Sequence, residues 1–192
     1  LYPSTESLKK PLLDEILNHT ATGRVLIFTR TKHRAKRLAD QLIRSQFRAV
    51  ALQGNMSQNK REQALEGFRR GKFDMLVATD VASRGIDVSE ITHVINFDMP
   101  NTVDAYIHRV GRTGRAGSIG EAFTLVTSDD RAMIKRIQTV LGSTIQQKRL
   151  PNFDYGAFNP VISTGSHRDA SYPVQGNNGH RQESPPERSG RP

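Results

Sequence analysis

The segment Val25-Leu26-Ile27-Phe28-Thr29-Arg30-Thr31 is the most informative part of the chain for predicting its fold. Its first four residues form an apolar run without interruption, which is typical of a strand buried on both faces of a sheet. Polar residues follow at once, and Thr31 is of a type that opens helices. Beyond it, apolar side chains recur at helical spacing, at Ala35, Leu38, Ala39, Leu42 and Ile43. The stretch therefore predicts a buried strand, a polar strand end and an amphipathic helix in direct succession.

The same succession recurs along the chain. Further apolar runs predict strands at 49–52, 75–78, 93–97 and 122–126. Helical patterns separate these runs, opened by Ser57, Thr102 and Ser128 and ended near Gly71 and Gly142. Buried strands that alternate with helices predict an α/β fold, in which a central, mainly parallel sheet carries helices on both faces.

Polar residues at the C-terminal ends of parallel strands line the ligand crevice of such folds. In this chain the predicted strand ends are Thr29-Arg30-Thr31, Gln53-Gly54, Thr79-Asp80 and Asp98. The search for a functional site therefore starts at these residues.

The chain divides into three segments by composition. Residues 1–20 are interpreted as a lead-in helix and interdomain linker, with Leu8, Leu12, Leu13, Ile16 and Leu17 on its apolar stripe. Residues 21–150 carry the alternating pattern and are predicted to form one domain. Residues 151–192 hold six of the nine prolines and no lysine. This low-complexity tail is predicted to be disordered, because it has too little apolar surface to offset its chain entropy. Its aromatic side chains Phe153, Tyr155 and Phe158 are the ones that would dock on the domain.

Charge and composition narrow the class of function. The net charge is +9, and the last 42 residues balance four arginines against four acidic residues, so the excess lies on the predicted domain. A basic domain favours polyanions, either nucleic acid or nucleotide phosphates. The chain has no cysteine, and its six histidines show no metal-ligand spacing, so no metal site is expected. No apolar run is long enough to cross a bilayer, and the start is not that of a signal peptide. We expect a cytoplasmic protein without membrane contacts.

The segment from His108 to Arg115 places Arg109, Arg112 and Arg115 at three-residue spacing among glycines. Guanidinium groups are planar, permanently charged and bidentate toward phosphate oxygens. An arginine set against a transferring phosphoryl group raises rates by roughly 10³–10⁵. The alternative is a solvated basic helix end, which would use lysine as readily and would not need the glycines. The pattern therefore favours a phosphate-facing site.

Two further segments carry candidate ligand contacts. In Thr79–Asp87, a buried strand ends on Thr79 and Asp80, and the chain reaches a second carboxylate at Asp87. Such a pair also suits acid–base catalysis or a metal, and a plain surface loop remains open. In the other segment, Gln58 and Arg61 occupy the first turn of a helix, where amide groups attract phosphate. A basic run, with Lys32, Arg34, Lys36 and Arg37, is interpreted as a solvated helix surface.

Together these segments resemble the second RecA-like domain of a DEAD-box helicase of superfamily 2. Val25–Thr31 resembles motif IV, Gln58–Arg61 the QxxR motif, Thr79–Asp87 motif V and His108–Arg115 motif VI. The resemblance covers about residues 20 to 145, with the motifs in order, and departs from the usual pattern at Gln53 and Ser83. Thr29-Arg30-Thr31-Lys32-His33 and the Pro-rich tail most resemble the bacterial RhlE subgroup. The fold it implies is a RecA-like three-layer sandwich.

The resemblance also implies roles for individual residues. Arg112 and Arg115 would reach the γ-phosphate of ATP across the interdomain cleft, Arg115 as the arginine finger. His108 would be a third catalytic residue, and Asp87 would contact the ribose. The RNA backbone would be held by Gln58, Arg61, Thr79, Thr31 and Gly54. Coupling between domains would involve Arg84, Arg109 and Asp80.

Half of the expected machinery is missing from the sequence. Neither G-x-x-x-x-G-K-[ST] nor an Asp-Glu-Ala-Asp box occurs, so the phosphate cradle and the ligands of Mg²⁺ are expected on an N-terminal RecA-like domain absent from this chain. The start at Leu1 without an initiator Met also favours a fragment. We therefore expect the C-terminal half of an ATP-dependent RNA helicase, inactive alone. The alternative is a stand-alone RNA-binding module without ATPase activity; a self-contained nucleotidase is disfavoured by the missing motif. RNA identity and oligomeric state are left open.

Overall fold

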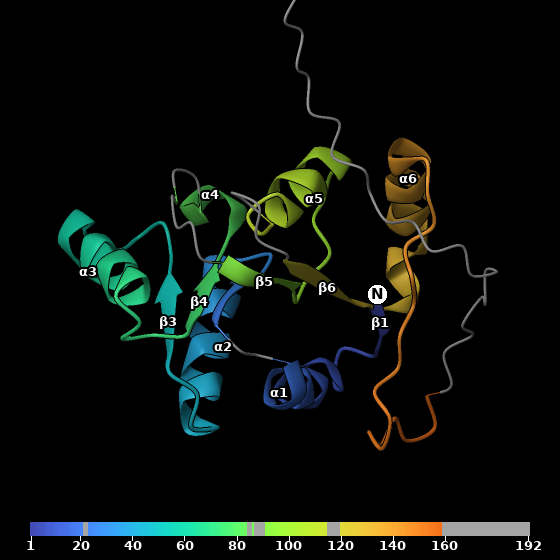
Figure 1. Ribbon diagram of the computed structural model, residues 1–192, viewed down its shortest axis with the longest axis horizontal. Coiled ribbons are helices and arrows are strands. Elements are labelled where there is room, and N and C mark those ends of the chain that lie inside the picture. Colours follow the sequence, from blue (N-terminus) through green and yellow to red (C-terminus); the bar gives the residue numbers. More distant parts are fainter. Residues whose placement is uncertain (21–22, 84–85, 87–90, 115–119, 159–192) are drawn as a thin grey trace, which may run out of the picture.

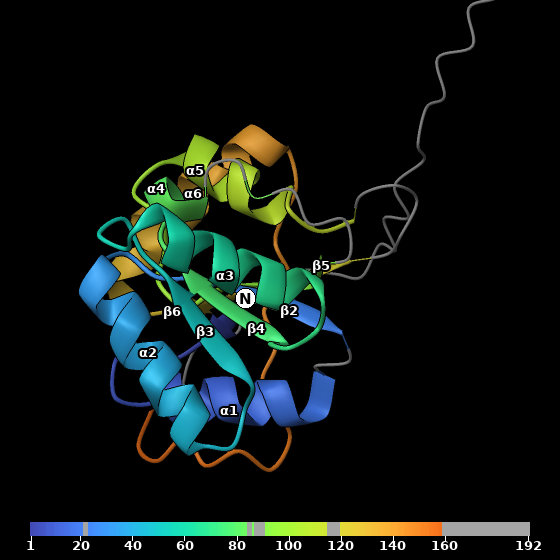
Figure 2. The same cartoon turned by 90° about the vertical axis from the view of Figure 1, so that its left-hand side faces the viewer.

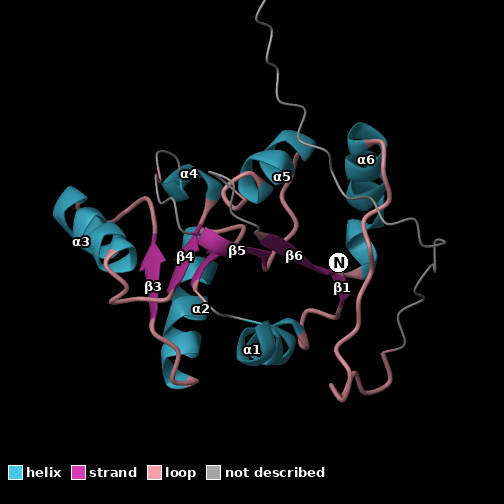
Figure 3. Ribbon diagram, in the orientation of Figure 1, coloured by secondary structure: helices cyan, strands magenta, loops and turns pink. Residues whose placement is uncertain are grey.

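The computed structural model describes residues 1–20, 23–83, 86, 91–114 and 120–158. Its centre is a sheet of six parallel strands in the order β1-β6-β5-β2-β4-β3. The strands are β1 (Tyr2–Pro3), β2 (Arg24–Phe28), β3 (Ala49–Leu52), β4 (Met75–Ala78), β5 (Ile91–Asn96) and β6 (Glu121–Val126). Strand and helix alternate along the chain, as Figure 3 shows. The predicted α/β class is confirmed.

Six α-helices are described, and they cover both faces of the sheet (Figures 1 and 2). They are α1 (Lys9–Thr20), α2 (Lys32–Arg44), α3 (Gln58–Arg69), α4 (Asp80–Ser83), α5 (Val103–Val110) and α6 (Arg131–Leu141). Successive residues of β2 point to opposite faces, so Val25 and Ile27 pack with α1 and α2, while Leu26 and Phe28 pack with α3 and α4. The two faces are both apolar, which is why β2 has no polar residue between Val25 and Phe28. This arrangement is a RecA-like three-layer sandwich.

The N-terminal segment is part of the same body. Tyr2 pairs with Leu125 of β6, and Leu12, Leu13 and Ile16 of α1 are fully buried in the core on that face. The segment interpreted as a lead-in helix therefore also supplies an edge strand. The pattern of alternation did not predict that strand, because two residues are too few to show a period.

The C-terminal end of the described chain returns to the start. The Leu1 carbonyl accepts a hydrogen bond from the Lys148 amide at 2.8 Å. Tyr155 is buried, and Phe153 and Phe158 pack against the same core cluster, so the expected docking of these three aromatic residues is confirmed. The rest of the tail predicted to be disordered, residues 159–192, lies outside the described residues.

The predicted start of the last helix was wrong by three residues. Ser128–Asp130 form a 3₁₀ turn, and α6 begins only at Arg131. The reason is local: Asp130 accepts from the Thr127 amide at 2.8 Å, and this capping contact closes a tighter turn first. The predicted end is right, since Gly142 adopts a left-handed φ of 64° after Leu141. None of the described helices is long and apolar enough to cross a bilayer.

Candidate functional site

Because every strand is parallel, all the polar strand ends lie along one edge of the sheet. Thr31, Gly54, Gln58 and Thr79 follow β2, β3 and β4 at this edge, and we call these four residues the strand-end face. Gly54 and Gln58 are exposed, Thr31 is exposed, and Thr79 is half-buried. The structure therefore brings four of the five residues that the sequence assigned to the RNA backbone to this edge, and the fifth, Arg61, lies within α3.

Thr31 is oriented by its helix. It is the N-cap of α2, and its Oγ1 accepts from the Arg34 amide at 3.2 Å. Since that contact uses an oxygen lone pair, the hydroxyl proton is left available for donation to a ligand. Gln58 is the first residue of α3 and follows the N-cap Ser57. Its side-chain amide donates a hydrogen bond to the Glu62 carboxylate at 2.8 Å. A Cβ atom added to Gly54 would have no neighbouring atom within 4 Å, so the space beside this residue is open.

Arg61 and Thr79 bracket the short helix α4. The Arg61 guanidinium donates to the Ala82 carbonyl at 2.6 Å, and Thr79 Oγ1 accepts from the Ala82 amide at 3.4 Å. Arg61 is half-buried, so it lies against the protein for part of its length. Both residues expected to touch RNA therefore also hold the turn that follows β4.

Arg109 is a large charged side chain that is almost completely buried in this region. Its Nε and Nη2 donate to the two oxygens of Asp80 at 2.6 and 2.8 Å. Its Nη1 donates to Asn96 Oδ1 at 3.1 Å and to the Asp98 carbonyl at 2.8 Å. The guanidinium also stacks over the Phe28 ring, 4.9 Å from its centroid. Four of its five N–H groups are thus used within the domain.

We call Asp80, Asn96, Asp98 and Arg109 the α4–α5 joint. The Arg109 side chain is 2% exposed, whereas that of Asp80 is 46% exposed. The sequence predicted a role in coupling between domains for both residues, and the structure shows the Arg109 guanidinium buried on Asp80, Asn96 and Asp98. Its proposed coupling role would therefore act through Asp80 and the helix ends that it holds together.

Arg112 lies one turn beyond Arg109 and is half-buried. Its Nη1 donates to the Ile86 carbonyl at 3.2 Å, which links the end of α5 to the segment after α4. His108, on the same helix, is exposed. Arg84, Asp87 and Arg115, which the sequence assigned to coupling, ribose and γ-phosphate, lie outside the described residues.

Thr113 and Gly114, shortly after α5, lie close to residues 91, 92 and 120. The Thr113 hydroxyl lies 2.7 Å from the Ile91 carbonyl and 3.0 Å from that of Thr92, so it can donate to the start of β5. Gly114 has a left-handed φ of 69°. A Cβ on Gly120 would lie 2.5 Å from the Gly114 nitrogen. The absence of a side chain at Gly120 therefore lets the backbone before β6 approach the backbone at Gly114.

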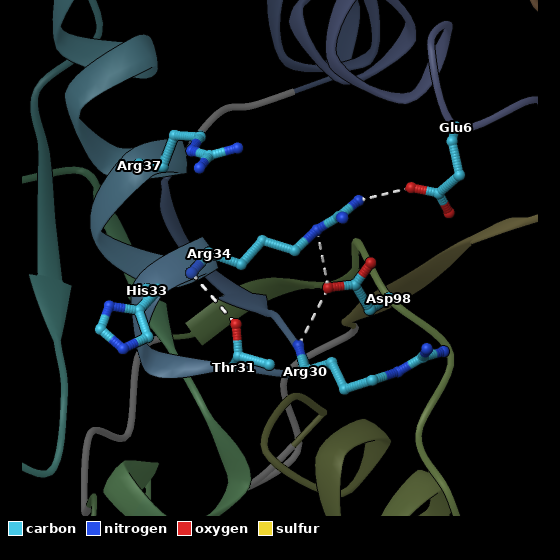
Figure 4. Close-up of a pocket in the computed structure, with 7 residues that line it drawn as sticks. All are labelled: Glu6, Arg30, Thr31, His33, Arg34, Arg37 and Asp98. Atoms are coloured by element: carbon cyan, nitrogen blue, oxygen red, sulfur yellow. Dashed lines mark hydrogen bonds and ion pairs between the residues drawn. The ribbon is translucent and has the colours of Figure 1, made fainter.

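Asp98 is the residue whose importance the sequence did not reveal. Its Oδ2 accepts a hydrogen bond from the Arg30 amide at 2.9 Å and forms an ion pair with Arg34 Nε at 3.0 Å (Figure 4). Its Oδ1 lies 3.5 Å from Lys9 Nζ. Its carbonyl is one of the acceptors of Arg109. Asp98 thus connects the N-terminal segment, the loop after β2 and α5. Its place at a strand end was the only signal in the sequence, because its partners are distant along the chain.

No group of three or more His, Asp or Glu that could hold a metal occurs within the described ranges. The carboxylate of Asp80 faces an arginine and that of Asp98 faces an arginine and a lysine, so both are matched by cations. The described part of the site is therefore suited to binding anions.

The chain is similar to known helicase domains. Residues 8–117 match the family described as helicase conserved C-terminal domain. The structure of the E. coli DEAD-box protein SrmB, bound to the regulator RraA, is 34% identical, covers 82% of this chain and 95% of that chain, and has a TM-score of 0.74. S. cerevisiae Dbp5 bound to RNA and ADP BeF3 is 31% identical over 78% of this chain and 40% of that chain, with a TM-score of 0.71.

A third similar structure is the RNA helicase Prp28 from Chaetomium thermophilum bound to ADP. It is 36% identical over 74% of this chain and 36% of that chain, with a TM-score of 0.68. The chain therefore spans nearly all of the SrmB chain, but only about two fifths of Dbp5 and Prp28.

Proposed function

Since the chain belongs to the helicase conserved C-terminal domain family, and within it to the DEAD-box proteins, we propose that it is the C-terminal half of an ATP-dependent RNA helicase. In the whole protein it would bind the RNA backbone and supply arginines to ATP at the cleft with an N-terminal RecA-like domain. The observation that supports this proposal is a pair of links between α4 and α5: Arg112 donates to the Ile86 carbonyl just after α4, and Arg109 pairs with Asp80 at the start of α4. Through these links, the domain would meet RNA at the strand-end face and a nucleotide at Arg112 at the same time.

The RNA contacts proposed for the strand-end face are backbone contacts. The Thr31 hydroxyl, the open backbone at Gly54 and the Gln58 amide suit phosphate and sugar oxygens, and such contacts carry no base information. Arg61 would exchange or share its bond to the Ala82 carbonyl for one to a phosphate. The Dbp5 structure bound to RNA supports RNA as the polymer. Binding would thus be independent of sequence.

Arg112 would contribute to catalysis by charge. A guanidinium beside the γ-phosphate stabilises the negative charge that develops on its oxygens as the phosphoryl group transfers. Arg115 and His108 are proposed to complete this group, and Asp87 to hold the ribose. Mg²⁺ would be held by the N-terminal domain, and it would neutralise phosphate charge there. The proposed assignment to the RhlE subgroup rests on Thr29–His33 and the Pro-rich tail.

The first test separates the arginines' proposed role from RNA binding. In the two-domain protein, Arg112→Ala should lower RNA-stimulated ATP hydrolysis by about 10³-fold or more. RNA affinity without nucleotide, measured by fluorescence anisotropy, should stay within about twofold. Arg136→Ala, on the exposed side of α6, is the matched control and should change neither quantity. Equal losses of hydrolysis and RNA affinity in Arg112→Ala would show that Arg112 has a different role.

The second test addresses the alternative of a stand-alone RNA-binding module. The isolated chain should show negligible RNA-stimulated ATP hydrolysis, and the two-domain protein should show it. Robust hydrolysis by the isolated chain would contradict the composite site. RNA binding by both forms, without hydrolysis in either, would favour the module.

A further inference from the structure

A cavity of about 380 Å³ opens beside the loop after β2, next to the strand-end face. It lies between the β1–α1 turn, the first turns of α2 and the end of β5 (Figure 4). Its lining is almost entirely charged or polar, and comprises Glu6, Arg30, Thr31, His33, Arg34, Arg37 and Asp98. Only Thr31 of these belongs to the proposed RNA contacts.

The two carboxylates of the cavity are already matched by two cations. Glu6 is 2.6 Å from Lys9 and 2.8 Å from Arg34, and Asp98 is 3.0 Å from Arg34. Burial alone would raise the pKa of Glu6, but hydrogen bonds from Lys9 and Arg34 hold it below its ordinary value. Glu6 therefore stays ionised at neutral pH, and the pairs with Lys9 and Arg34 leave no net negative charge.

Arg30 and Arg37 remain as the uncompensated charges of the cavity. Arg30 and Arg37 are both exposed, and within the described part of the chain neither guanidinium has an ion-pair or hydrogen-bond partner. Figure 4 shows them on opposite sides of the Arg34–Asp98 pair, with His33 on the side of Arg37. The basic residues that the sequence predicted to form a solvated helix surface therefore differ in their surroundings. Arg34 pairs with the carboxylates of Glu6 and Asp98, while Arg37 lines the cavity without such a pair.

From this arrangement we propose that the cavity is a binding site for consecutive phosphate groups. A guanidinium binds phosphate oxygens through paired N–H donors, and two guanidiniums on either side of a matched ion pair suit two phosphates better than one. The source is either a free polyphosphate chain or a stretch of RNA backbone beyond the strand-end face. The second source rests on the proposed function, whereas the first does not.

The test uses the whole 192-residue chain and sodium tripolyphosphate, titrated by calorimetry at about 0.15 M salt, where the Debye length is near 8 Å. Saturable binding at one site is expected, and Arg30→Gln with Arg37→Gln should weaken it by about tenfold or more. Both side chains are exposed, so far-ultraviolet circular dichroism should be unchanged. The matched control removes the same charge from exposed arginines of α6, by Arg131→Gln with Arg136→Gln, and should retain the affinity.

Two further arms identify the source and the selectivity. If a ten-nucleotide single-stranded RNA displaces tripolyphosphate, RNA backbone enters the cavity; if it binds without displacement, the cavity takes a free phosphate chain. Gln58→Ala should weaken the binding of RNA but not the binding of tripolyphosphate. A failure of the proposed RNA contacts can therefore be distinguished from a failure of the cavity site. The inference is overturned if tripolyphosphate shows no saturable binding, or if the paired variants of the cavity and of α6 weaken its binding equally. It is also overturned if a glutamate peptide of matched charge displaces tripolyphosphate as well as RNA does.

Discussion

The α4–α5 joint and the strand-end face lie at the same edge of one sheet, yet they use polar residues in opposite ways. In the joint, Arg109 is 2% exposed and makes four hydrogen bonds to residues of this domain. On the strand-end face, Gly54 and Gln58 are exposed and the space above Gly54 is open. Residue type alone therefore does not distinguish a charged side chain that stabilises the fold from a polar side chain that is available to a ligand. The burial of the side chain and its hydrogen-bond partners make that distinction.

The largest effect on stability is expected from breaking the joint. Arg109→Met keeps an unbranched side chain but leaves Asp80, Asn96 Oδ1 and the Asp98 carbonyl without their donor. Removing one partner of a buried pair typically costs 3–5 kcal/mol, and because Asp80 is half-exposed we expect about 3 kcal/mol. Urea unfolding at unchanged m-value measures it. The control is Arg112→Met, because the structure describes one hydrogen-bond acceptor for Arg112, and it should lower the free energy of unfolding by less than about 1 kcal/mol. Equal losses in the two variants would show that Arg109 has no special structural role.

A glycine pair tests the same contrast in the backbone. Gly120→Ala would place a Cβ 2.5 Å from the Gly114 nitrogen, so the loop after α5 must shift, at a cost of about 2 kcal/mol. Gly54→Ala meets no atom within 4 Å and needs no left-handed φ, so it should be neutral or stabilise by up to about 1 kcal/mol. Thermal unfolding of the two variants side by side gives the comparison. A destabilised Gly54→Ala would mean that the strand-end face is packed rather than open.

The smallest effect is expected at Glu6, the exposed carboxylate of the cavity. Glu6→Gln removes a 61% exposed carboxylate from Lys9 and Arg34, and should cost less than about 1 kcal/mol at pH 7. Because the folded pKa of Glu6 lies below its ordinary 4.5, its contribution is present above that pH and is lost as pH falls through the lowered pKa. The stabilities of the wild type and Glu6→Gln should therefore converge in acid. A difference that persists at pH 2 would assign the effect to packing.

Much of the site was predictable because its residues are placed by local structure. Thr31 and Thr102 cap their helices through contacts to residues three positions ahead, and the apolar runs match the buried strands within two residues. The prediction for the start of α6 failed at the same local scale, since two kinds of helical turn compete for Ser128–Asp130. The roles of Asp98 and the cavity were not predictable, because Arg30 is 68 residues from Asp98 in the chain.

Local sequence alone was enough to predict strands β2 to β6, the longer helices between them, the N-caps Thr31, Ser57 and Thr102, and the polar residues that follow the strands. These follow from periodicity and from hydrogen bonds that span a few residues. Only the tertiary structure decided which arginine of the segment after Val103 turns inward, and which carboxylates are already paired. Those outcomes depend on partners brought together by folding, such as Asp80 with Arg109, 29 residues apart. A buried charge is stable only beside such partners, so its place in the molecule is determined by the fold and not by its own sequence neighbours.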